Sequence, residues 1–132
     1  MDIDFAFLCD HAEKAGKVSA LGIGFDTIYA AELPQRHHRL CVVARFRAHK
    51  TEAGRKRVQF DIIDADGGEL VSIKGAIEIP EPTTKLETAQ TLILNFDDLE
   101  IQRYGPHSVH ILVEGIEMKR IGFSVLVPPA EG

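Results

Sequence analysis

The chain has 132 residues, of which 45% are hydrophobic and 27% are charged, and its formal net charge is −5. These values predict one globular domain over residues 1–132 and exclude a collagen-like repeat and a largely disordered chain. No apolar run approaches the roughly 20 residues of a membrane-spanning helix, and no secretory leader is recognisable, so we expect a cytoplasmic protein without a membrane span.

Most segments alternate apolar and polar residues with a period of two, which is typical of half-buried β-strands. Gly22 and Gly24 lie inside one such segment and indicate a bulge or a close backbone approach. Residues 83–88 are expected to form one helical turn or an irregular crossing. The predicted strands cover about residues 3–9, 18–29, 38–48, 57–62, 70–79, 91–96, 109–113 and 118–127.

The last two strands form the clearest hairpin. Their inward residues are all odd-numbered, so directly opposed residues must have numbers that sum to an even value. A three-residue loop at 114–116, with its central glycine left-handed and a local bulge, satisfies this condition. This register pairs His110 with Arg120 and Leu112 with Met118 on the outer face, which makes Leu112 and Met118 a small candidate contact surface.

Seven or eight strands without a long helix predict an all-β fold, specifically an antiparallel two-sheet sandwich of the immunoglobulin or fibronectin type. A closed barrel is the structural alternative. Tyr104, Gly105 and Pro106 precede the seventh strand and suit a corner where the chain changes sheets, so Tyr104 is a candidate tyrosine corner.

The two cysteines are expected to face opposite environments. Cys9 shares strand parity with apolar residues, whereas Cys41 shares parity with arginines, so a disulfide between them is disfavoured. Cys9 and His11 could form a nucleophile and its base, but an extended strand separates them by about 7 Å. A buried structural thiol is the favoured interpretation, and no catalytic residue is assigned.

Metal and cofactor sites are not predicted. Aspartates in two turns could bind calcium if the turns met at one end of the sandwich, but Asp-Gly turns also form for backbone reasons alone. The histidine pairs do not present two imidazoles on one face, and histidines at strand ends are expected to be solvated. The residues considered are Asp64, Asp66, Asp97, Asp98, His37, His38, His107 and His110.

The strongest specific feature is a basic segment. Residues 36–57 hold eight arginines and lysines against Glu52 alone, a net charge of +7, while the rest of the chain carries −12. A common solvent face of arginines could hold phosphate or carboxylate groups. The alternative is a solvated face whose arginines pair with Asp61 and nearby acids. The candidate residues of this surface are Arg39, Arg45, Arg47 and Arg57.

Several motifs resemble a family of small bacterial proteins catalogued as a domain of unknown function. They are FLCDHAE at residues 7–13, LGIGFD at 21–26, IDADG at 63–67 and the hairpin from Tyr104-Gly105 to Glu114-Gly115. The chain has Phe25 where a typical member has Trp. The resemblance implies an immunoglobulin-like sandwich and a bacterial cytosolic context, and it implies no activity or catalytic residue.

The leading hypothesis is therefore a non-catalytic module that binds a protein partner or self-associates into a homo-oligomer through an exposed sheet face or edge strand. The alternative is an anion-binding module that uses the basic segment. The third hypothesis is a divalent-metal enzyme or lipid-binding module. Nucleic acid is disfavoured because the chain is acidic overall and lacks interleaved aromatic residues and known binding motifs.

Overall fold

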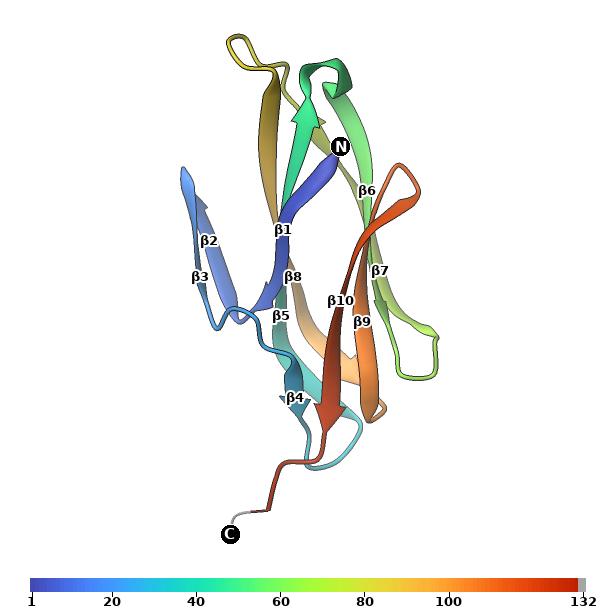
Figure 1. Cartoon of the computed structure of the whole chain (residues 1–132). Helices are drawn as coiled ribbons and strands as arrows, with labels where there is room; N and C mark the ends of the chain where they lie inside the picture. The colour runs from blue at the N-terminus through green and yellow to red at the C-terminus, as the bar shows by residue number, and fades with distance from the viewer. Residues whose placement is uncertain (131–132) are drawn as a thin grey trace.

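The computed structural model describes residues 1–130 as a β-sandwich of ten strands and one short 3-10 helix, η1 (Lys50–Glu52). Figure 1 shows the two layers facing each other along the length of the molecule. The predicted all-β sandwich is confirmed, although it has more strands than expected. The strands are β1 (Asp2–Cys9), β2 (His11–Ala15), β3 (Lys17–Leu21), β4 (Thr27–Tyr29), β5 (Gln35–His49), β6 (Gly54–Ile63), β7 (Glu69–Ile79), β8 (Glu87–Ile101), β9 (Gly105–Val113) and β10 (Ile116–Leu126).

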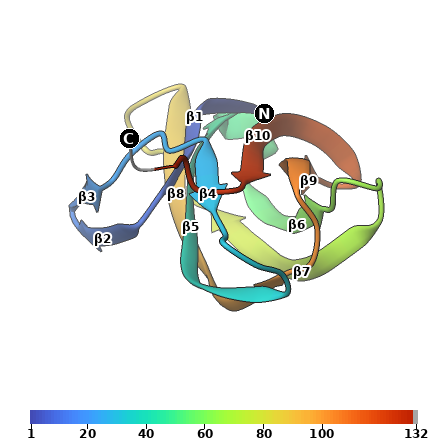
Figure 2. The ribbon, with the colours of Figure 1, turned by 90° about the horizontal axis from the view of Figure 1, so that it is seen from below.

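The strands form two main sheets and a separate hairpin. One sheet has the order β1-β5-β8, the other has the order β4-β10-β9-β6-β7, and β2 pairs with β3. All pairs are antiparallel except β4 with β10, which is parallel. The view from below in Figure 2 shows the β2-β3 hairpin standing out beside the β1-β5-β8 sheet.

The core lies between the two main sheets, where one row of side chains from each strand excludes water. The inward rows of the long strands contribute the largest buried side chains, as the alternating pattern predicted. Five residues that represent these rows, and on which the sandwich prediction depends, are all 3% exposed or less: Val42, Phe46, Phe60, Ile111 and Phe123.

The segment predicted as one strand over 18–29 is in fact two strands, β3 and β4. Gly22 and Gly24 both have positive φ, at 68° and 77°, which turns the chain out of the β2-β3 hairpin. The side chain of Asp10 occupies the space that a Cβ of Gly22 would need. Residues 11–15, between the first two predicted strands, form strand β2, because they pair with β3.

Strand β8 is much longer than the predicted strand at 91–96. It runs alongside β5 from the pair Gln35 and Ile101 to the pair His49 and Glu87, so the 15 residues of β5 provide a ladder along its whole length. Asp98, at φ 52°, interrupts the ladder without ending the strand. Residues 83–86 form an irregular connection, which is the second of the two forms expected for 83–88, and η1 is a helical turn that was not predicted.

The crossover from β8 to β9 changes sheets, as the residues around Tyr104 predicted. The Tyr104 hydroxyl donates a hydrogen bond to the Ala30 carbonyl at 2.8 Å. Its acceptor is 74 residues upstream, so this is not a tyrosine corner, whose acceptor is only a few residues away. The bond instead ties the crossover to the end of β4.

The β9-β10 hairpin has a two-residue turn and not the predicted three-residue loop. Glu114 and Gly115 both have positive φ, at 50° and 80°, as a type I′ turn requires. The extra residue is a bulge near Met118, which packs against the core. Leu112 therefore lies opposite Glu117, so the predicted pair of Leu112 with Met118 is wrong.

The bulge nevertheless restores the even sum that the inward rows require. Arg120 lies opposite His110 and Ile121 lies opposite Val109, so the predicted pairing of His110 with Arg120 is confirmed. The hydrophobic pattern thus specified the register beyond the bulge. Because the turn itself has only two residues, the extra residue lies in the strand as a bulge and not in the loop.

The predicted separation of the two cysteines is wrong. β1 contains a bulge between Ile3 and Phe5, which shifts its register with β5 and moves Cys9 to the outer face of the sheet. Cys9 lies directly opposite Cys41, and both are fully buried. Parity along a strand holds only while no extra residue intervenes.

Substitution at two adjacent positions of β9 tests which face of the strand is the core face. Ile111→Ala should reduce the free energy of unfolding by about 2–5 kcal/mol, because it removes a fully buried side chain. Leu112→Ala, on the outer face, should cost about 1 kcal/mol or less. Urea denaturation measures both, and equal losses would contradict this assignment of faces.

Candidate functional site

The four candidate arginines do not form one surface. Arg39, Arg45 and Arg47 lie on the outer face of β5, whereas Arg57 lies on β6 in the other sheet. Even on β5 the set is divided, because Cys41 and Val43 between them are fully buried against the β2-β3 hairpin. Arg45 and Arg47 alone form a close pair, at the far end of β5 from Arg39.

Each of these arginines is held by carboxylates. Arg39 Nε donates to Asp97 at 2.8 Å. Arg47 makes two hydrogen bonds to Asp4, at 2.8 and 2.6 Å, and Arg45 Nε lies 3.3 Å from the same carboxylate. The arginines were expected to pair with Asp61 and nearby acids. The prediction is wrong for Asp61, which accepts hydrogen bonds from Gln59 and Ser72 instead.

Arg57 is paired on the other sheet. Its guanidinium donates to Glu114 Oε2 at 3.0 and 3.2 Å, and its backbone N–H donates to Glu114 Oε1 at 2.8 Å. The backbone hydrogen bond and then the guanidinium hold the pKa of Glu114 below its usual value. Glu114 therefore couples the β9-β10 turn to β6.

A hollow of about 310 Å³ lies beside this ion pair on the outer face of the five-stranded sheet. Its lining includes Arg57, Leu112 and Lys74, and Gly75 leaves room between them. The structure thus brings together Leu112 and Arg57, which were separate candidates in the sequence analysis. Met118 does not line this hollow and packs against the core.

Another hollow, of about 420 Å³, lies beside Arg45 and Arg47. Its other lining residues come from the segment 82–89, which supplies the cation of Lys85 and several threonine hydroxyls. Glu87 also lies there, 3.5 Å from Arg47. Hydrogen bonding from Arg47 holds the pKa of Asp4 below its usual value, so Asp4 remains ionised and offsets part of the positive charge.

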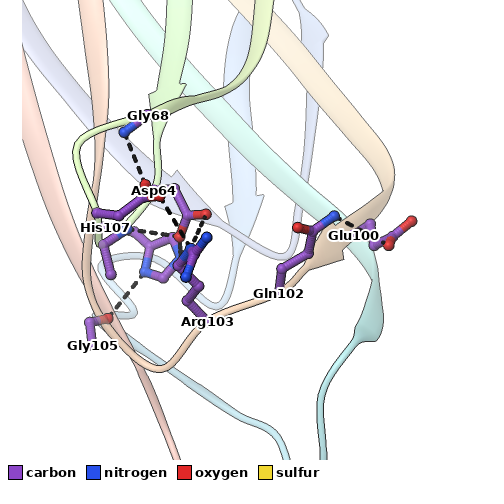
Figure 3. Close-up of polar contacts among 9 residues, drawn as sticks. Asp64, Gly68, Glu100, Gln102, Arg103, Gly105 and His107 are labelled. Carbon is purple, nitrogen blue, oxygen red and sulfur yellow. Dashed lines mark hydrogen bonds and ion pairs between the residues drawn. The ribbon is translucent and has the colours of Figure 1, made fainter.

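Figure 3 shows a polar cluster that sequence reasoning missed, around His107. His107 is buried, with its ring stacked on Phe123 at 5.2 Å between ring centroids. Its Nδ1 lies 3.0 Å from the Gly105 carbonyl, and its Nε2 lies 3.0 Å from Asp64 Oδ1, in the geometry of an ion pair and not of an aligned hydrogen bond. Arg103 contacts Asp64 from the other side at 3.4 Å.

This cluster joins the β6-β7 turn to the β8-β9 crossover. The expectation that histidines at strand ends are solvated is wrong for His107, because it shares the parity of the inward residues Val109 and Ile111. That parity was the signal that could have found it. Burying an imidazole and a carboxylate is costly unless polar groups surround them. Here His107 and Asp64 lie beside each other, and the Gly105 carbonyl and Arg103 lie next to them, so the cluster has a structural role.

Another chain of polar contacts lies on the outer face of β9 and β10. Ser108 Oγ is 2.7 Å from His110 Nε2, and His110 Nδ1 is 2.6 Å from Glu117 Oε1. This is the order of hydroxyl, imidazole and carboxylate that serine hydrolases use. Ser108, however, lies opposite Ile63 on one neighbouring strand and Gly122 on the other. The backbone of Ser108 takes part in the sheet ladder, so its N–H group is not free to stabilise a developing oxyanion.

Three of the four aspartates considered for calcium are engaged elsewhere. Asp64 and Asp66 contact Arg103, and Asp97 contacts Arg39. Within residues 1–130, no group of three or more His, Cys, Asp or Glu side chains is placed to hold a metal ion. In the same part of the chain, no helix has the length and apolar character needed to cross a membrane.

Acidification tests the ion pair between Asp4 and Arg47. Because the folded-state pKa of Asp4 is lowered, its ionised form stabilises the protein above the unfolded pKa, and this contribution is lost as the pH falls through the folded pKa. Asp4→Asn should therefore unfold at lower urea at pH 7 and lose less stability than the wild type between pH 7 and pH values below about 4. Glu32→Gln, at an exposed loop position, is the control and should follow the wild type.

Three of the solved structures that are similar to parts of this chain are much larger than it. One is the alkylpurine DNA glycosylase AlkC of Pseudomonas fluorescens bound to DNA containing an abasic site analog, with 15% identity and a TM-score of 0.49 over 77% of this chain and 28% of that one. A glycosyl hydrolase family 2 member from Bacteroides cellulosilyticus DSM 14838 has 12% identity and a TM-score of 0.38 over 70% and 13%. A β-glucuronidase from glycoside hydrolase family 2 has 12% identity and a TM-score of 0.39 over 75% and 11%.

These similarities cover a minor part of each larger protein and carry no inference about activity here. No curated protein matches the chain. The model of a family of unknown function, DUF6941, matches residues 4–126. This match covers nearly all of the sequence and agrees with the resemblance of its motifs. The chain belongs to the family of unknown function DUF6941.

Proposed function

We propose that this protein is a non-catalytic, cytoplasmic bacterial module that acts through protein contact, with the free edge of β8 as its contact surface. The observation that carries the proposal is the uncharged run at residues 88–94 on that edge. Among the strands of residues 1–130, β8 hydrogen-bonds only with β5. An exposed edge of this kind presents unpaired N–H and C=O groups that can pair with another strand.

The other three edges of the two main sheets are protected, which singles out β8 among them. β1 carries Asp2 and Asp4, and β4 has only three residues. β7 has charged residues along its length and a glycine in its interior. The run on β8 contains no charge, proline or glycine. Lys14 Nζ of the β2-β3 hairpin contacts the Thr91 carbonyl in this run at 3.5 Å, so a strand that pairs here must displace the lysine side chain.

We infer that the occupant of this edge is a second copy of the chain. From Asn95 onward β8 shares a hollow with β7, so the accessible part of the edge is centred on Thr91. Antiparallel pairing of two copies about Thr91 matches the uncharged run with itself and places Glu87 of each copy opposite the neutral Asn95 of the other. Pairing centred one residue later would instead place Glu87 opposite Asp97, which are like charges.

A lysine on the symmetry axis tests this dimer. Thr91→Lys should convert the dimer to a monomer, because two ammonium groups would face each other across the axis, beside Arg45 of each copy. Glu78→Gln on β7 raises the net charge by the same amount and should leave the dimer intact. Light scattering should give about twice 14.6 kDa for the wild type and for Glu78→Gln.

Two results would contradict the edge dimer. One is a wild-type protein that stays monomeric at every concentration at which it dissolves. The other is a dimer that persists in Thr91→Lys while retaining the wild-type circular dichroism, because the contact would then lie elsewhere.

A second candidate function is anion binding in the hollow beside Arg45 and Arg47. The observation that favours it is the combination of these guanidinium groups with Lys85 and threonine hydroxyls around one space. Such groups suit phosphate or sulfate oxygens. Asp4 and Glu87 compete for the same cations, so binding would require the anion to displace or share these carboxylates.

Retention on heparin distinguishes the anion-binding candidate. Arg47→Glu should elute at clearly lower salt than the wild type, because it removes a cation from the hollow. Arg57→Glu makes the same change of charge on the other sheet and should have little effect. If both variants elute together, the retention reflects overall charge and the hollow is not an anion site.

A further inference from the structure

We propose that Cys9 and Cys41 are an oxidative modification site, which forms a disulfide between β1 and β5 beneath the β2-β3 hairpin. The two residues are directly opposed in the antiparallel ladder, and both thiols are free. Opposed residues in such a ladder have Cα atoms about 4.5–5.5 Å apart, which lies inside the range of about 4.4–6.8 Å found in disulfides. The backbone therefore needs little movement.

The hairpin controls access to this site. Both cysteines are fully buried, and the residues that cover them include Ala12, Val18 and Ala20 of the hairpin. These covering side chains are small or partly exposed, and each hairpin strand has only five residues. A two-stranded element with so little buried apolar surface opens more easily than the sandwich core. Oxidation therefore requires local opening of the hairpin and not unfolding of the protein.

The two thiols are not equivalent. Burial raises the pKa of Cys9 to about 12, and its hydrogen bond to Cys41 adds to that rise. Burial also raises the pKa of Cys41, but the hydrogen bond from Cys9, the positive charge of Arg39 and the backbone N–H of Ala12 act in the opposite direction. Cys41 is therefore the first to ionise and the attacking sulfur, and Cys9 is the resolving thiol.

The oxidant that the proposal requires is a small-molecule disulfide, such as oxidised glutathione. The Cys41 thiolate attacks one sulfur of that disulfide, whose S–S bond breaks and releases one glutathione thiolate. Cys9 then loses its proton to the released thiolate and attacks the Cys41 sulfur, which displaces the second glutathione. The two protein thiols are oxidised to one disulfide, and one glutathione disulfide is reduced to two thiols.

Intact mass under non-reducing conditions tests the proposal with the full chain and oxidised glutathione. The wild type should lose two hydrogens, retain no glutathione and remain uncrosslinked between chains. Cys9→Ser should retain one glutathione on Cys41, because the resolving thiol is absent. Cys41→Ser should react several-fold more slowly than Cys9→Ser, because the remaining thiol is the one that ionises less readily.

A hairpin variant tests the access route. Val18→Ser removes an apolar contact over the cysteines and should increase the wild-type oxidation rate several-fold, whereas Ser19→Ala, at an exposed position of the same strand, should not. The proposal is wrong if the native protein keeps two free thiols under conditions that oxidise the unfolded chain in urea. It is also wrong if the wild type accumulates two bound glutathiones, whereas equal rates for the two single-cysteine variants would overturn only the assignment of Cys41 as the attacking sulfur.

Discussion

The ladder that β5 forms with β1 and β8 is the constraint on which the other features depend. β5 is 15 residues long, and its middle is buried on both faces: the five residues 40–44 are all fully buried, with one row in the main core and the other under the β2-β3 hairpin. A strand covered on both faces loses the polar alternation of a half-exposed one. The cysteine pair is buried because of this second cover.

The same strand order brings acidic side chains next to the basic segment. The basic residues of β5 lie next to acids that arrive from other parts of the chain, with Asp4 on β1 and both Glu87 and Asp97 on β8. On the other sheet, the turn after β9 brings Glu114 to Arg57. Exposed pairs of this kind contribute little stability individually. Together they offset the positive charge that the sequence concentrates in residues 36–57.

Predictions from alternation succeeded wherever a strand ran without interruption. The inward rows of β6, β9 and β10 follow directly from the sequence, because a period of two places every second side chain on the same face. Predictions failed at the bulge in β1, where one extra residue reverses the parity of the residues beyond it. In the β9-β10 hairpin only the place of the extra residue was wrong, because the bulge lies near Met118 and not in the loop. Of the candidate site, the outward direction of the β5 arginines was predictable, whereas their carboxylate partners were not, since those partners are 40 or more residues away in the chain, on the neighbouring strands β1 and β8.

The amino-acid sequence by itself determined the all-β class, the membership of the core rows and the position of most turns, because these depend on local hydrophobic periodicity and on glycine and Asp-Gly backbone chemistry. Tertiary structure alone decided that His107 is paired with Asp64, that Cys9 lies opposite Cys41 and that β8 has a free edge. Each of these depends on which distant strands become neighbours, and that choice is made by the packing of whole sheets and not by any local preference.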